Sequence, residues 1–142
     1  MPDSVLVAVD GSPLAERALG YALDTFPDAA FTSIYVIDPV DSVVAVEAGG
    51  LSVADEWHDD ALEHARTVHA TATDLAAEHG TSIETATEIG RPATEIVEYA
   101  VDNDVDQIVL GSHGRSGLDR TFMGSVAERV TRRAQIPVTV VA

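Results

Sequence analysis

Short apolar runs alternate along this chain with stretches of helical periodicity. Apolar runs of strand length occur at five places: Val5 to Val9, Phe31 to Ile37, Ile83 to Ile89, Gln107 to Gly111 and Pro137 to Val141. Runs such as the first are apolar on both faces, which is typical of parallel strands covered on two sides. The run from residue 83 alternates between apolar and polar residues, so we expect it nearer an edge of the sheet.

The intervening segments have helix signals. Ser12 is the expected N-cap of a first helix that starts with Pro13. The longest helix is expected to begin at Ser52 and to end before Gly80, with its apolar face formed by Trp57, Ala61, Ala65, Val68, Ala72 and Leu75. Two further helices are predicted over Pro92 to Val101 and Ser125 to Ala134. Five strands separated by four helices predict an α/β fold, with one parallel sheet and right-handed crossovers.

The composition is that of a folded globular protein. The chain has 142 residues, of which 46% are hydrophobic, and we expect one domain over residues 1–142. It has no cysteine, which excludes disulfides and thiol chemistry. We find no apolar run long enough to span a membrane and no signal peptide, so we expect a cytoplasmic protein that does not bind membranes.

The charge balance is strongly acidic. The chain has 24 acidic and 8 basic residues, a formal charge of −16, and it contains no lysine. A disordered acidic tail is excluded because the acids are scattered from Asp3 to Glu128. An acidic surface for cations or basic partners remains an alternative, but scattered acids without lysine favour adaptation to a salt-rich, halophilic cytoplasm. The same charge argues against nonspecific nucleic-acid binding.

A glycine-rich segment carries the candidate chemistry. Gly111, Gly114, Gly124 and Ser125 follow the spacing Gly-x2-Gly-x9-Gly-Ser, between a predicted strand and a predicted helix. Glycine lets a backbone approach an anion, and a helix N-terminus favours negative charge. The pattern is neither a Walker A motif nor Gly-x-Gly-x-x-Gly. It predicts a polyphosphate site that is built mostly from backbone.

Each candidate also has a simpler structural interpretation. Ser125-x-x-Glu128 fits a helix capping box, and Asp10 fits a turn before the first helix. His113 either contacts phosphate or only shapes the loop.

The remaining histidines fall in or just after the longest predicted helix: His58, His64, His69 and His79. Their spacings do not suit a zinc site on one helix face, so we expect solvated side chains and no metal site.

In sequence order, these motifs resemble the universal stress protein family over essentially the whole chain. The similarity covers Val7 to Ser12, Tyr35 to Asp38, the glycine signature, Ser125 to Val130 and Pro137 to Val141. It implies a Rossmann-like (HUP-type) doubly wound sheet of five parallel strands in the order 3-2-1-4-5, with helices on both faces. The complete signature is similar to that of the family's ATP-binding branch.

The resemblance also implies a ligand set. Its nucleotide contacts fall on Ala8, Val9, Asp10, Val36, Leu110, Gly111, His113, Gly114, Arg115, Gly124, Ser125 and Val126. Mg or Mn would accompany ATP, held mainly by the phosphates. A homodimer through the last strand, Val138 to Val141, is also implied.

Two classes of function follow. The first is an ATP-binding stress-response or regulatory module, and the second is a slow ATP hydrolase or ATP-dependent phosphotransferase. The chain has no lysine for charge stabilisation, and its loop offers only Arg115 and Arg120. We therefore favour the binding module, with no catalytic residue and at most weak hydrolysis. The segment from Asp38 to Leu51 is a candidate cover for the site.

Overall fold

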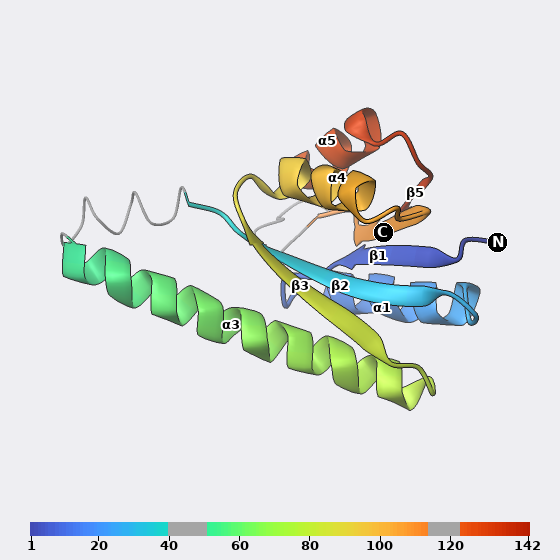
Figure 1. Cartoon of the computed structure of the whole chain (residues 1–142), viewed down its shortest axis with the longest axis horizontal. Helices are drawn as coiled ribbons and strands as arrows, with labels where there is room; N and C mark the ends of the chain where they lie inside the picture. Colours follow the sequence, from blue (N-terminus) through green and yellow to red (C-terminus); the bar gives the residue numbers. More distant parts are fainter. Residues whose placement is uncertain (40–50, 114–122) are drawn as a thin grey trace.

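The computed structural model describes residues 1–39, 51–113 and 123–142. Its strands pair in parallel in the order β3-β2-β1-β4-β5, which confirms the predicted fold and strand order (Figure 1). The strands are β1 (Ser4–Ala8), β2 (Ala30–Ile37), β3 (Ile83–Ile89), β4 (Gln107–Gly111) and β5 (Val138–Val141). The helices described are α1 (Pro13–Thr25), α3 (Leu51–Glu78), α4 (Pro92–Asp102) and α5 (Ser125–Arg133).

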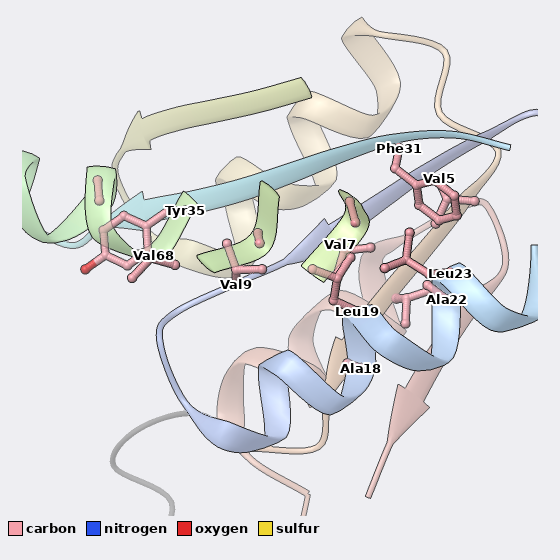
Figure 2. Close-up of a cluster of buried hydrophobic side chains, with 14 of the residues drawn as sticks. Val5, Val7, Val9, Ala18, Leu19, Ala22, Leu23, Phe31, Tyr35 and Val68 are labelled. Atoms are coloured by element: carbon pink, nitrogen blue, oxygen red, sulfur yellow. The ribbon is translucent and has the colours of Figure 1, made fainter. Parts of the chain in front are cut away.

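Two helical layers sandwich the sheet. In Figure 1, α1 and α3 lie below the strands, while α4 and α5 lie above them. Each layer closes its own hydrophobic core, because alternate residues of a buried parallel strand point to opposite faces. Val5 and Val7 pack with α1 and α3, whereas Leu6 packs with α4 and α5. Figure 2 shows the first core, with Leu19 and Leu23 of α1 close to Val5 and Val7.

The helix ends follow the predicted local chemistry. The Ser12 hydroxyl accepts a hydrogen bond from the Ala15 amide at 3.2 Å, so Ser12 is the N-cap of α1 as predicted. Beyond α3, Gly80 has a φ of +73°, and its amide donates to the Ala77 carbonyl. The Thr81 amide donates to the Ala76 carbonyl, which completes a Schellman motif. The long helix therefore ends where the sequence predicts.

The prediction that the histidines of the long helix are all solvated is wrong for His69. This residue is only 8% exposed, and its ring links α3 to two strands of the sheet. Its Nδ1 lies 2.8 Å from the Ser33 hydroxyl of β2, and its Nε2 lies 3.1 Å from the Thr87 hydroxyl of β3. Burial lowers the pKa of His69 below its ordinary value of 6.5, partly offset by a hydrogen bond with the Ala86 backbone. These two hydrogen bonds of His69, which we call the His69 pin, thus hold α3 on the sheet.

The carboxyl ends of the strands lie together at one edge of the sheet. The register pairs Ala8 with Ile34 and Val7 with Val109, so β1 ends between β2 and β4. The helix α3, 28 residues long, extends past this edge at its N-terminal end (Figure 1). In such folds this is where ligands bind. Within the described residues, no helix is both long and apolar enough to cross a membrane.

Candidate functional site

A cavity of about 780 Å³ opens at the carboxyl edge of the sheet. It runs from the end of β2 past the end of β1 to the end of β4, and α3, α4 and α5 contribute to its walls. Every predicted site residue within the described ranges lines it: Ala8, Val9, Asp10, Val36, Leu110, Gly111, His113, Gly124, Ser125 and Val126. Gly114 and Arg115 lie outside the described residues, as does most of the predicted cover segment.

One end of the cavity, which we call the α5 end, is formed by Gly111, His113, Gly124, Ser125 and Val126. Here the predicted capping box is wrong. Gly124 is the N-cap of α5, with φ −67° and ψ 162°, and Ser125 is the first residue of the helix. Because glycine has no side chain, the cap supplies no side-chain acceptor for the amides at the start of α5. The amides of the first helical turn lack intrahelical acceptors, so this end suits an anion.

Gly124 also joins the two ends of the glycine-rich segment. Its amide donates to the Ser112 carbonyl at 2.6 Å, which holds the start of α5 against the end of β4. A β-carbon at Gly124 would lie 3.1 Å from that carbonyl oxygen and 3.1 Å from the His113 Cα. This spacing is too close for a side chain without a local shift. Glycine therefore suits this close backbone approach, and any larger residue would need its neighbours to give by a few tenths of an ångström.

The middle of the cavity is formed where the chain leaves β1. One carboxylate oxygen of Asp10 accepts from the Ser12 amide at 2.9 Å, so the predicted turn role of Asp10 is present. Asp10 also lines the cavity, and the turn and ligand interpretations are compatible. Gly11 follows with a φ of +83°, a conformation that favours glycine. This turn carries the chain from β1 to the start of α1.

The opposite end, which we call the α3 end, includes four residues absent from our predicted site. Trp57, Asp60, Ala61 and His64 line the cavity. Their spacing of i, i+3, i+4 and i+7 places them on one face of α3. The sequence predicts Trp57 and Ala61 only as part of the apolar face of this helix, because their period is also that of a buried helix face. The two polar residues on that face were the signal that part of it meets a cavity.

Aromatic contacts hold the α3 end against β2. The His64 ring lies edge-on to the Tyr35 ring, with centroids 5.6 Å apart and planes at 71°. Tyr35 also makes an edge contact with His69, at 6.5 Å and 85°. Figure 2 shows the Tyr35 ring beside Val68 of α3. His64 and Tyr35 both line the cavity, so this packing fixes part of its wall.

The charges of the cavity wall are unequally distributed. Asp38 and Asp60 line the α3 end, and Asp10 lies between the two ends. Among the described lining residues there is no arginine or lysine. Within the part of the chain that the structure describes, no group of three or more His, Asp or Glu side chains could hold a metal ion. Within the described residues, an anion at the α5 end would meet backbone dipoles and His113.

Comparison with known proteins agrees with this architecture. Residues 1–142 match the family described as the universal stress protein family. The chain belongs to the universal stress protein family. Universal stress protein MJ0531 of Methanocaldococcus jannaschii is 36% identical over 141 residues, which are 96% of this chain and 80% of that protein.

Solved universal stress proteins share the fold. The structure of the hypothetical protein MJ0577, a universal stress protein of the same archaeon, superposes with a TM-score of 0.85 at 28% identity, covering 98% of this chain and 94% of that chain. A universal stress protein in complex with cAMP gives 0.68 at 23% identity, covering 99% and 97%. A family member from Arabidopsis thaliana with AMP bound gives 0.67 at 18% identity, covering 99% and 91%.

Proposed function

We propose that this chain forms one universal stress protein domain that binds an adenine nucleotide, ATP in the first instance, as a regulatory or stress-response module. The observation that carries the proposal is the start of α5. A helix N-terminus with a glycine cap opens directly into a large cavity at the carboxyl edge of a parallel sheet. This is the arrangement in which α/β folds hold nucleotide phosphates.

The shape of the cavity supports the proposal. Its volume of about 780 Å³ lies within the range of roughly 300–1,000 Å³ that is usual for small-molecule sites. Ser125 and Val126 would hold the phosphates through backbone amides, while the Gly124 amide donates to the Ser112 carbonyl and holds the start of α5 in place. The AMP and cAMP complexes belong to other family members, and they make an adenine nucleotide the first ligand to test.

A divalent cation, Mg or Mn, would accompany the triphosphate and be held mainly by its oxygens. The acidic residues in the described part of the cavity wall are Asp10, Asp38 and Asp60, and no group of three or more described side chains could hold a metal ion. When bound, the cation would neutralise phosphate charge next to an acidic protein. The chain's own contribution would be the amides of the first turn of α5.

We propose binding in preference to catalysis. Phosphoryl transfer depends on cationic groups and a positioned nucleophile. The chain has no lysine, and its glycine-rich segment offers only Arg115 and Arg120, which lie outside the described residues. ATP would accordingly remain largely intact in the site, with weak hydrolysis at most.

The test is the nucleotide content of the protein purified in molar salt with magnesium, measured by chromatography after denaturation. The proposal predicts near-stoichiometric ATP, and a higher melting temperature on adding ATP to protein freed of nucleotide. ADP alone would favour a hydrolase. Absence of nucleotide, together with an unchanged melting temperature, would contradict the proposal.

We also propose a homodimer through β5. This strand is at the end of the sheet order, and its residues are only half-buried in the single chain. An edge strand presents unpaired backbone groups on which a second copy can continue a sheet. Sedimentation in molar salt should give twice the mass of 14.9 kDa. The carbonyls of Pro137 and Val141 accept from β4, so the backbone of Val140 faces the open edge, and a Val140→Pro variant should give the monomer. A wild-type monomer would contradict this proposal.

A further inference from the structure

We propose that Trp57 is the residue on which the nucleotide base stacks, so that α3 reads the base while α5 holds the phosphates. The inference rests on the proposed function and deepens it by assigning a specificity-determining residue. It starts from the face of α3 formed by Trp57, Asp60, Ala61 and His64, all of which line the cavity. This face lies in a helix that the glycine signature does not include.

The direction in which a nucleotide would lie follows from the charges of the wall. Asp38 and Asp60 lie at the α3 end, where a phosphate would meet negative charge. The α5 end offers the amides and the positive end of a helix dipole. The phosphates therefore belong at the α5 end, and the uncharged base extends towards α3.

Trp57 has the position of a stacking residue. It is half-buried, it packs against the core shared by α1 and α3, and it also lines the cavity. One part of the side chain is thus held by apolar neighbours while another part borders the space that the base would enter. Tryptophan offers a large aromatic surface and loses little conformational freedom on binding a ring.

The helix that carries Trp57 is anchored before any ligand arrives. Ala65 and Val68 are buried in the core, and His69 is pinned to Ser33 and Thr87. Nearer the cavity, His64 packs edge-on against Tyr35. Trp57 is two helical turns before His64 on the same face, so its place is fixed by packing that does not need the nucleotide.

This arrangement predicts a particular selectivity. Stacking depends on the area and polarisability of the ring, so a purine should bind more tightly than a pyrimidine. Stacking alone does not read the hydrogen-bonding edge of the base. The stacking on Trp57 should therefore produce a much larger difference in affinity between ATP and CTP than between ATP and GTP.

The sequence supplies a direct reporter, because Trp57 is the only tryptophan in the chain. Nucleotide-free protein is titrated with ATP, CTP and inorganic tripolyphosphate in molar salt with magnesium, by fluorescence and by calorimetry. The variants are Trp57→Ala and Trp57→Phe. Tyr21→Ala, which alters an exposed aromatic residue of α1 outside the cavity, is the matched control.

We expect ATP to change the fluorescence of Trp57 and tripolyphosphate to leave it nearly unchanged. Trp57→Ala should weaken ATP roughly five- to a hundred-fold, which corresponds to the usual worth of one aromatic–base stack. Trp57→Phe should retain most of the affinity, and tripolyphosphate should bind all variants equally. If Trp57→Ala does not fold, the wild-type fluorescence still decides the question, because ATP must change it and tripolyphosphate must not.

Two outcomes overturn the inference in different ways. If ATP binds the wild type tightly but neither changes the fluorescence nor loses affinity in Trp57→Ala, the base lies elsewhere and the proposed nucleotide binding survives. If neither ATP nor tripolyphosphate binds the wild type, the proposed function fails, and the role of Trp57 fails with it.

Discussion

The two ends of the cavity differ in whether backbone or side chains form them. Apart from His113, the α5 end is formed mainly by backbone: a glycine cap, the amides of a first helical turn, and a carbonyl–amide contact of 2.6 Å between Ser112 and Gly124. The α3 end consists of side chains, with Trp57 and His64 on a helix that packing and a buried histidine hold in place. At the α5 end the sequence must keep a small residue, glycine, where backbones come close. At the α3 end it must supply particular side chains.

This difference explains what each end can recognise. Amide groups of a helix start bind any anion of suitable size, so the α5 end would accept phosphate without identifying the molecule that carries it. Rings and carboxylates differ from position to position, so the α3 end would set the preference for one ligand over another. Substitutions at the two ends should therefore have separable effects.

Gly124→Val should have the largest effect. A β-carbon there meets the Ser112 carbonyl oxygen and the His113 Cα at 3.1 Å, so this backbone contact must widen, and the two further methyl groups of valine should displace the start of α5. Several amide–phosphate contacts, each worth about 1.5–3 kcal/mol, would be displaced together, and ATP affinity should fall roughly a hundred-fold or more by calorimetry.

Gly20→Ala is the matched control for this substitution. Gly20 lies within α1, and a β-carbon there meets no atom within 4 Å. The control should bind ATP normally and gain up to about 1 kcal/mol of stability, because alanine favours a helix. Normal ATP affinity in a folded Gly124→Val variant would show that the α5 end does not hold the phosphates.

Replacing Ser125 separates the backbone of the α5 end from its side chain. Proline is well tolerated at the first position of a helix, and the preceding Gly124 already has the extended ψ of 162° that proline requires. Ser125→Pro removes one amide donor and should weaken ATP about ten- to a hundred-fold. Ser125→Ala removes only a hydroxyl and should weaken it about two- to ten-fold.

The comparison of these two variants is made by calorimetry, with circular dichroism to confirm that α5 is retained. The account requires Ser125→Pro to lose more affinity than Ser125→Ala. The reverse order would mean that the hydroxyl, and not the amide, carries the contact.

The pinning of α3 should depend on pH. Because burial lowers the pKa of His69 below 6.5, the unfolded chain takes up the proton more readily than the folded one. The stability contributed by neutral His69 is therefore complete above about pH 6.5 and is lost as the pH falls from there towards the lowered folded value. Denaturant unfolding at pH 7.5 and pH 5 should show this loss in the wild type and little of it in His69→Gln.

His58→Gln is the control, because His58 is exposed on the same helix and should keep the wild-type pH dependence. Ser33→Ala tests the pin at constant pH. It removes the 2.8 Å partner of the His69 Nδ1 and should cost about 1–3 kcal/mol. An equal pH dependence in His69→Gln and the wild type would show that His69 is not the titrating group.

Salt concentration should change ligand affinity less than the substitutions above do. Its effect should fall chiefly on the binding of the triphosphate. With a net charge of −16, the protein repels ATP at low salt, and screening reduces that repulsion as the Debye length shrinks from about 10 Å at 0.1 M to about 3 Å at 1 M. ATP affinity should rise by a few-fold over this range, while adenosine affinity should stay nearly constant. The melting temperature should also rise by a few degrees, and an unchanged value would count against salt adaptation.

The sequence predicted the sheet well because its signals are local. Continuous apolar runs, Ser12-Pro13 at a helix start and Gly80 at a helix end each determine structure within a few residues. The α5 end was predicted for a similar reason, since glycine spacing records where a backbone must come close. Its cap was nevertheless misassigned, because Gly124 and Ser125 are both acceptable N-caps and only the backbone angles distinguish them.

The α3 end could not be predicted in the same way. The period of Trp57 and Ala61 is that of any buried helix face, and nothing local shows that α3 extends past the sheet at this point. The burial of His69 has the same cause, since its partners Ser33 and Thr87 come from distant strands. Such contacts depend on how α3 is placed on the sheet, which is a property of the whole fold.

The structure of the complex with ATP and magnesium, determined in molar salt, would show whether α5 holds the phosphates while α3 contacts the base. We expect phosphate oxygens within hydrogen-bonding distance of the Ser125 and Val126 amides, with the base beside Trp57. Phosphates bound away from the start of α5, or a base directed away from α3, would contradict it.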